Sequence, residues 1–411
     1  MRTLIKNISS LVGILPEGKL RLQGEEMDHV GEIKDAFVLI ENGLIKSFGR
    51  EEDLPGDLCA DKTIDAERGM VMPSWCDSHT HLVYAGSREG EFLDKIKGLS
   101  YERIAQNGGG ILNSADLLHN TPEDELFSQS MERVNEVIRK GTGALEIKSG
   151  YGLRTEDELK MLRVIRRIKE TSPAIIMSTF LGAHAVGRGY TKEEYVNLVC
   201  EEMIPSVAKE SLADFIDVFC DKGFFTPEDT SRILEKGAQY GIKPKIHANE
   251  LDVSGGVQVG VRHRALSVDH LERTTEAEIE ALKGSDTMPT MLPGSSFFLG
   301  IPFGRAKDFI REGLGIALAS DYNPGSSPSG DMRMVMALGC IRMRLTPAQA
   351  FNACTINSAY AMGISHLTGS VTLGKKANLI LTLPGKSLTS IPYMYTTPFI
   401  KTILLSGEEI E

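Results

Sequence analysis

The sequence of 411 residues predicts an α/β protein, a (β/α)8 barrel of the TIM type with a small composite β-sandwich domain. Eight short apolar runs alternate with helix-like stretches in the middle of the chain, which is typical of a parallel barrel. Strand-like segments separated by turn signals fill both ends of the chain. Polar residues of metal-binding types gather where the middle strands are predicted to end, where barrels of this kind place their active sites.

The two ends of the chain share one texture of short apolar runs and turns. The segment "DAFVLIENGLIKSFGR" holds Asn42-Gly43 between two strand-like pieces, which predicts a hairpin. The C-terminal segments "GSVTLGKKANLILTLPG" and "FIKTILLSGEEI" have the same character. We therefore expect residues 1–66 and 369–411 to form the composite β-sandwich domain and residues 67–368 to form the barrel.

The middle of the chain supplies the eight barrel strands. They are expected within residues 69–82, 143–152, 174–184, 214–221, 243–250, 265–272, 286–294 and 315–325. Helices are expected between them, for example over residues 155–170, 226–241 and 275–284. In the first of these helices, Thr155 and Glu158 have the spacing of a capping box.

Composition and charge exclude several classes of protein. The net charge of −11, without a block of Lys or Arg, argues against a nucleic-acid partner. No run of about 20 apolar residues predicts a membrane span, and the N-terminus does not resemble a signal peptide. The six cysteines are scattered without a CxxC pair, which fits a reducing compartment. We expect a cytoplasmic protein.

Four predicted strand ends carry side chains that bind metals. His79 and His81 follow an apolar run, and residues at i and i+2 of a strand point to the same side. His247, His270 and Asp321 lie at the ends of later strands. A histidine pair bonded within a loop, or a buried histidine bonded to a carbonyl, would explain each alone but not the set. Three histidines and a carboxylate suit Zn²⁺ or Fe²⁺, with one position left for water.

These motifs resemble the amidohydrolase superfamily. The shared features are HxH on strand one, "HANE" with His247 and Glu250, a further histidine and a final aspartate. Many two-metal members carry a carboxylated lysine at the end of strand four. The expected fourth strand, "DFIDVFCD", does not end in a lysine, which favours a site for one metal ion. Lys148 falls on strand two and is expected to be structural.

Stretches between the ligands resemble the imidazolonepropionase family within that superfamily. They are "HTHLVYAGSREGEF", "SYERIAQNGGGI", "EIKSGYGL", "TFLGAHA", "HANE", "SVDHLE", "LPGSSFFL" and "SDYNPGSSP", and they span nearly the whole chain. The resemblance implies a homodimer with one divalent metal per chain, zinc or iron. It also implies hydrolysis of 4-imidazolone-5-propanoate to N-formimidoyl-L-glutamate in histidine degradation. One departure is "AHAVGRGYT", where the family more often has prolines after the histidine.

The same resemblance implies roles for individual residues. The metal ligands would be His79, His81, His247 and Asp321. The catalytic residues would be Glu250, His270 and Asp321. The substrate would be bound by Arg88, Tyr101, Tyr151, His184, Glu250, Asn323, Gly325 and Ser326. Arg88 suits the propionate because its planar guanidinium is always charged, although arginines of this kind often form surface ion pairs instead.

Two other functions remain compatible with parts of the pattern. A cytosine- or guanine-type deaminase shares HxH, HxxE, the further histidine and the aspartate. Arg88 and Tyr151 favour a substrate with a carboxylate over a neutral base. A non-catalytic barrel that has lost its ligands is disfavoured because every expected ligand is present in the sequence.

Overall fold

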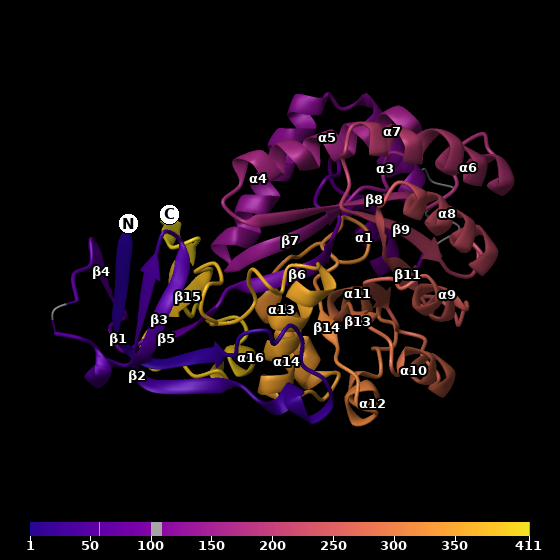
Figure 1. Cartoon of the computed structure of the whole chain (residues 1–411). Coiled ribbons are helices and arrows are strands. Elements are labelled where there is room, and N and C mark those ends of the chain that lie inside the picture. The colour runs from indigo at the N-terminus through magenta and orange to yellow at the C-terminus, as the bar shows by residue number, and fades with distance from the viewer. Residues whose placement is uncertain (57, 100–108, 411) are drawn as a thin grey trace.

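The computed structural model describes residues 1–56, 58–99 and 109–410, which form a helix-covered barrel and a separate sheet beside it (Figure 1). The strands fall into two groups. One follows the order β14-β13-β12-β11-β9-β8-β7-β6, with β10 beside β9. The other follows the order β17-β16-β15-β5-β1-β2-β3, with β4 beside β1. The predicted fold class, a (β/α)8 barrel with a separate sheet domain, is confirmed.

The barrel strands are parallel and lie in the eight predicted segments. Their bounds are β6 (Trp75–Thr80), β7 (Thr142–Lys148), β8 (Ile175–Ala183), β9 (Phe215–Cys220), β10 (Lys243–Pro244), β11 (Ile246–Ala248), β12 (Ser267–His270), β13 (Met288–Met291) and β14 (Ala317–Leu318). The ring closes where the backbone of Asp321 donates to the His79 carbonyl at 3.0 Å. The backbone of His81 donates in turn to the Tyr322 carbonyl at 2.9 Å. The first and last strand ends therefore meet, and both carry predicted metal ligands.

Helices alternate with the barrel strands and follow the last of them, and most of these helices cover the outside of the barrel (Figure 1). They are α1 (Glu89–Ile96), α3 (Ile111–Asn120), α4 (Glu123–Arg139), α5 (Thr155–Thr171), α6 (Lys192–Leu198), η3 (Val199–Met203), α7 (Ile204–Lys209), α8 (Pro227–Gln239), α9 (Gly256–Arg262), α10 (Glu276–Leu282), α11 (Pro293–Leu299), α12 (Ala306–Arg311), α13 (Met332–Ile341), α14 (Pro347–Ala353) and α15 (Ile356–Ala361). Helix α8 illustrates how the local sequence determines a helix. Thr226 caps it, Pro227 is its first residue, and Ile233 and Leu234 are buried on its inner face.

The capping box predicted for α5 is wrong. The N-cap is Arg154, and its side chain makes no capping bond. The Glu158 carboxylate instead accepts hydrogen bonds from the backbone N–H groups of Gly150, Gly152 and Leu153, at 3.1, 2.7 and 3.0 Å. The Glu158 carboxylate therefore bonds to the loop after β7 and not to the start of the helix. The N–H groups of this loop are buried and need acceptors.

The second sheet takes strands from both ends of the chain. They are β1 (Arg2–Ile14), β2 (Gly31–Glu41), β3 (Leu44–Arg50), β4 (Lys62–Asp65), β5 (Met70–Pro73), β15 (Leu379–Thr382), β16 (Ile400–Leu405) and β17 (Glu408–Ile410). Short helices η1 (Gly24–Asp28), η2 (Glu51–Asp53) and α16 (Ser390–Tyr393) lie between them in sequence. The two ends join where β15 pairs antiparallel with β5. The domain boundaries drawn from the sequence stay a prediction.

The predicted hairpin is confirmed. Strands β2 and β3 pair antiparallel around Asn42 and Gly43, whose φ angles are 51° and 79°. Two positive φ angles in a row are what the favoured two-residue hairpin turn requires. Within the described residues, no helix is both long and apolar enough to cross a membrane.

Candidate active site

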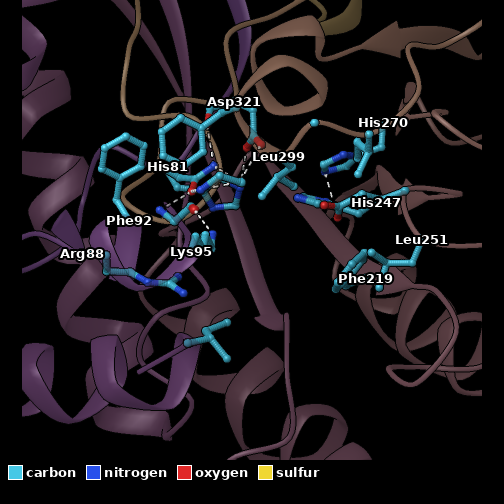
Figure 2. A pocket seen from close by; sticks show the side chains of 18 of the residues that line it. His81, Arg88, Phe92, Lys95, Phe219, His247, Leu251, His270, Leu299 and Asp321 are labelled. Carbon is cyan, nitrogen blue, oxygen red and sulfur yellow. Dashed lines mark hydrogen bonds and ion pairs between the residues drawn. The ribbon is translucent and has the colours of Figure 1, made fainter. Parts of the chain in front are cut away.

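A cavity of about 790 Å³ opens at the carboxyl ends of the barrel strands, and most of the predicted site residues line it. Those residues are His81, Arg88, Tyr151, His184, His247, Glu250, His270, Asp321, Asn323, Gly325 and Ser326. His79 is fully buried and lies against the side chains of His81 and Asp321. Tyr101 lies outside the described residues. Figure 2 shows the labelled histidines and Asp321 converging from different strands, with Arg88 approaching from the α1 side.

His79 is the residue that all the metal-binding donors share. A ring nitrogen of His79 lies within 4.8 Å of the ligand atoms of His81 and Asp321, and likewise of those of His247 and His270. The Nε2 atoms of His79 and His81 are 3.3 Å apart, and each is 3.6 Å from Oδ1 of Asp321. All of these side chains are buried.

Two carboxylates fix which nitrogen each histidine presents. The Nδ1 atom of His79 is 2.7 Å from Oδ2 of Asp269, and Nδ1 of His247 is 2.9 Å from Oδ2 of Asp217. Each Nδ1 therefore carries the proton and donates it, which leaves Nε2 as the nitrogen that can bind a metal. Among the described residues, Nε2 of His247 has no hydrogen-bond partner. The imidazoles of His79, His81 and His247, beside the Asp321 carboxylate, are ligands of the type that binds a divalent metal ion.

The sequence reasoning missed Asp217 and Asp269, although a signal was present. Both are acidic residues inside barrel strands, "FIDVFC" and "SVDH", and both are buried. Acidic residues are almost never fully buried unless they are paired. A charged side chain at an inward position of a barrel strand therefore indicates a partner in the interior.

His270 lies between two carboxylates. Its Nδ1 is 3.4 Å from Oε2 of Glu272 and its Nε2 is 3.8 Å from Oε2 of Glu250. Burial lowers the pKa of His270, but Glu250 and Glu272 outweigh burial and raise it to about 10. Burial also raises the pKa of the Glu250 carboxyl to about 7, against the lowering effect of His270. The pair thus holds a cationic imidazole beside a carboxyl that exchanges protons near neutral pH.

Arg88 forms one wall of the cavity and is held by Glu91. Its Nε and Nη2 atoms donate to the two oxygens of Glu91 at 3.0 and 2.6 Å. The same carboxylate accepts from the backbone of Gly110 at 2.9 Å. A Cβ atom at Gly325 would lie 2.3 Å from Nη1 of Arg88, so a larger residue there would displace the guanidinium. Glu91 was not found from the sequence, where a glutamate three residues after an arginine is unremarkable.

Tyr151 and His184 line the cavity beside His81. The rings of His81 and His184 stack with centroids 5.3 Å apart and planes 14° apart. The Nδ1–H of His184 donates to the Gly150 carbonyl at 3.1 Å. Burial lowers the pKa of His184 to about 3, so its ring is neutral and presents Nε2 to the site.

Asn323 and Ser326 belong to a turn that carries Asp321. The Asn323 side-chain oxygen accepts from the backbone of Gly325 and of Ser326, both at 2.8 Å. Its amide donates to the Asp321 carbonyl at 2.6 Å, and the Ser326 hydroxyl is 3.3 Å from Oδ2 of Asp321. These residues therefore set the position of Asp321 as well as lining the cavity.

The barrel with this cluster of histidines and aspartate has the form of a metal-dependent hydrolase, and sequence comparison agrees. A profile of the amidohydrolase family matches residues 70–409, and the chain belongs to this family. It is 51% identical over 412 residues to the imidazolonepropionase of Flavobacterium johnsoniae, covering 100% of both chains. It is 39% identical to that of Brevibacillus brevis, covering 98% of this chain and 96% of the other. The resemblance expected from the sequence is confirmed.

The fold also matches solved structures. An adenosine deaminase from Xanthomonas campestris with bound zinc superposes with a TM-score of 0.68 at 16% identity, covering 99% of this chain and 92% of the other. The family and the His/Asp groups together indicate a divalent metal.

Proposed function

We propose that this chain is an imidazolonepropionase, which hydrolyses 4-imidazolone-5-propanoate to N-formimidoyl-L-glutamate in histidine degradation. The identity of 51% across the full length of a relative with that name carries the proposal. The cavity agrees with it, since it places an arginine opposite a cluster suited to a metal. The reaction breaks a C–N bond of a cyclic amide by adding water.

His79, His81, His247 and Asp321 would hold one divalent cation, zinc or iron. A cation of this kind supplies Lewis-acid chemistry, which makes water a usable nucleophile at neutral pH. We propose one ion rather than two because the β9 strand, Phe215–Cys220, contains no lysine that could be carboxylated to bridge a pair. The lysine that follows it, Lys222, is exposed and pairs with Asp252 at 2.7 Å.

Two residues transfer protons and a third stabilises charge. Asp321 accepts a proton from the water that attacks the ring carbonyl carbon. The cationic His270 stabilises the negative charge that develops on the carbonyl oxygen. Glu250, whose pKa lies near 7, protonates the ring nitrogen as the C–N bond breaks. The roles of His270 and Glu250 rest on the geometry around His270, whose imidazole lies within 4 Å of the carboxylates of Glu250 and Glu272.

The substrate would lie between this cluster and Arg88. The guanidinium would bind the propionate, and Glu91 would fix its orientation through Nε and Nη2. Tyr151 and His184 would contact the ring from one side. The turn of Asn323, Gly325 and Ser326 would close the other side, and Tyr101 is proposed to join the set from the resemblance alone.

We further propose that the enzyme is a cytoplasmic homodimer. The scattered cysteines of the sequence, without a disulfide framework, fit a reducing compartment. The homodimer follows from the family resemblance.

The test is turnover by the purified, metal-loaded protein. We expect loss of the absorbance of 4-imidazolone-5-propanoate and formation of N-formimidoyl-L-glutamate, with no ammonia released from cytosine or guanine. Ammonia release from either base without reaction of the imidazolone would contradict the proposal and favour a deaminase.

A further inference from the structure

Beneath the candidate metal site, the barrel interior holds a group of charged side chains that the proposed reaction does not use. The group contains Glu146, Lys148, Asp217, Lys245 and Asp269, all fully buried or nearly so. They come from β7, β9, β12 and the residue that precedes β11. Charged side chains this deep require partners, and here the partners are one another.

Lys148 contacts the two oxygen atoms that orient the metal-binding histidines. Its Nζ lies 2.8 Å from Oδ2 of Asp217 and 3.5 Å from Oδ2 of Asp269. Those same two oxygens accept the Nδ1–H groups of His247 and His79. The third contact of Lys148 is Oε1 of Glu146 at 2.6 Å. One ammonium is therefore shared between the two supports of the metal site.

We infer that Lys148 is a positioning residue that fixes His79 and His247 through Asp269 and Asp217. The inference rests on the metal site proposed above. Lys148 does not act as a bridging carboxylated lysine, since that group would put a further negative charge among three carboxylates. As an ammonium it holds two carboxylates side by side that would otherwise repel each other.

The sign of the effect on metal binding separates positioning from simple charge. Lys148 is a buried cation near a dication, so electrostatics alone predicts that its removal tightens metal binding. Positioning predicts the opposite, because the released carboxylates no longer hold the two imidazoles with Nε2 aimed at the metal. Loss of the direct partner of a ligating histidine typically weakens metal affinity ten- to a hundredfold, and we expect a weakening up to about that size because Lys148 acts through two such partners.

Lys245 provides a matched control. It is as deeply buried as Lys148 and pairs with Oε2 of Glu146. Among the ion pairs of the described residues, it has none with Asp217 or Asp269. Replacing either lysine by methionine removes one buried cation, but only Lys148 touches the oxygens that orient the histidines.

The experiment measures the zinc dissociation constant of the full chain by competition with a chelator. The proteins are wild type, Lys148→Met and Lys245→Met, with thermal unfolding of each metal-free form to show that it is folded. We expect weaker zinc binding in Lys148→Met and an unchanged dissociation constant in Lys245→Met. Unchanged or tighter binding in Lys148→Met, or equal weakening in both variants, would overturn the inference.

A second comparison applies if Lys148→Met does not fold. The double variant Lys148→Gln with Glu146→Gln removes one buried cation and one buried anion, and its reference is Glu146→Gln alone. Positioning predicts weaker zinc binding in the double variant than in its reference, and equal binding would overturn the inference. A separate result would reject the proposed metal site itself. In that case wild type would bind no zinc, or would bind zinc that His79→Ala does not abolish.

Discussion

Arg88 is a single side chain of the cavity whose position is fixed by its neighbours. Glu91 holds two of its nitrogens, and Gly325 leaves room for the third. A lysine keeps the charge but has no planar fork for Glu91 to orient. The difference between arginine and lysine at this position is therefore geometric.

We predict that Arg88→Lys and Arg88→Ala lower kcat/KM on 4-imidazolone-5-propanoate. Loss of one charge-assisted contact costs roughly 1.5–3 kcal/mol, about ten- to a hundredfold, mostly in KM. Steady-state kinetics measures the loss, and the metal content should stay the same because Arg88 is not a ligand. An unchanged kcat/KM in Arg88→Ala would show that the propionate is bound elsewhere.

Glu250 should give the enzyme a falling alkaline limb. Its carboxyl must be protonated to donate to the leaving nitrogen, and its pKa is raised to about 7, so the active form is lost as pH rises above that value. The glutamine of Glu250→Gln cannot transfer a proton to the leaving nitrogen. Removing a general acid typically lowers kcat by about 10²–10⁴-fold. The pH profiles of kcat/KM for both proteins provide the measurement. A wild-type profile that is flat from neutral to alkaline pH would argue against this role.

At the scale of residues, the sequence predicted the ends of strands better than their interiors. His79, His81, His247, His270 and Asp321 stand out because a strand end is marked by the turn after it. The carboxylates that orient two of these histidines, Asp217 and Asp269, were missed. Their contacts with His247 and His79 depend on which strands become neighbours in the barrel. The contact between Arg88 and Glu91 is local, but nothing in its spacing distinguishes it from a surface pair.

The loop between β7 and α5 is built around the Glu158 carboxyl. This carboxyl accepts hydrogen bonds from three backbone N–H groups on either side of Tyr151 in the sequence, and Tyr151 lines the cavity. Motif spacing alone could not show this arrangement, because a glutamate at the third helical position serves a capping box equally well. The structure of the preceding loop decides which donors the carboxylate takes.

We predict a pH-dependent contribution of Glu158 to stability. Burial raises the pKa of Glu158 from 4.5 to about 7, against the lowering effect of its hydrogen bonds to Ser149 and to the loop N–H groups. A raised folded-state pKa means stability that is present below 4.5 and lost as pH rises through 7. The free energy of unfolding of wild type should therefore fall relative to Glu158→Gln by up to about 3 kcal/mol over that range. Denaturant unfolding at several pH values measures it, and parallel curves for the two proteins would contradict it.

At the scale of the whole molecule, the barrel and the composite sheet are both predictable from alternation along the chain. Each of the eight predicted segments holds a barrel strand, and most of them are short apolar runs between turn residues. The first segment also holds β5, which joins the other sheet. The closing contact between His79 and Asp321 is not readable from local pattern, since it joins the first and last barrel strands. It is instead a consequence of the predicted barrel topology.

We predict one equivalent of divalent metal per chain, and its removal should destabilise the fold. A ligand at 100 times its dissociation constant contributes about 2.7 kcal/mol to the stability of the state that binds it. Chelation should therefore lower the melting temperature of wild type, while His79→Ala should show a much smaller change. Elemental analysis giving two equivalents in active protein would contradict a site for a single ion.

The pairing of β5 with β15 has a consequence for folding during synthesis. Val71 pairs with Leu381, so β5 is synthesised long before its partner, and all the barrel strands leave the ribosome in between. Until then one edge of β5 has no β15 to pair with, and open strand edges promote association with other chains. Pro73, the last residue of β5, lies only two residues before Trp75, where β6 begins, and β6 carries His79. A nascent chain stopped short of residue 379 would therefore contain every proposed metal ligand and yet expose an unpaired strand beside the first of them.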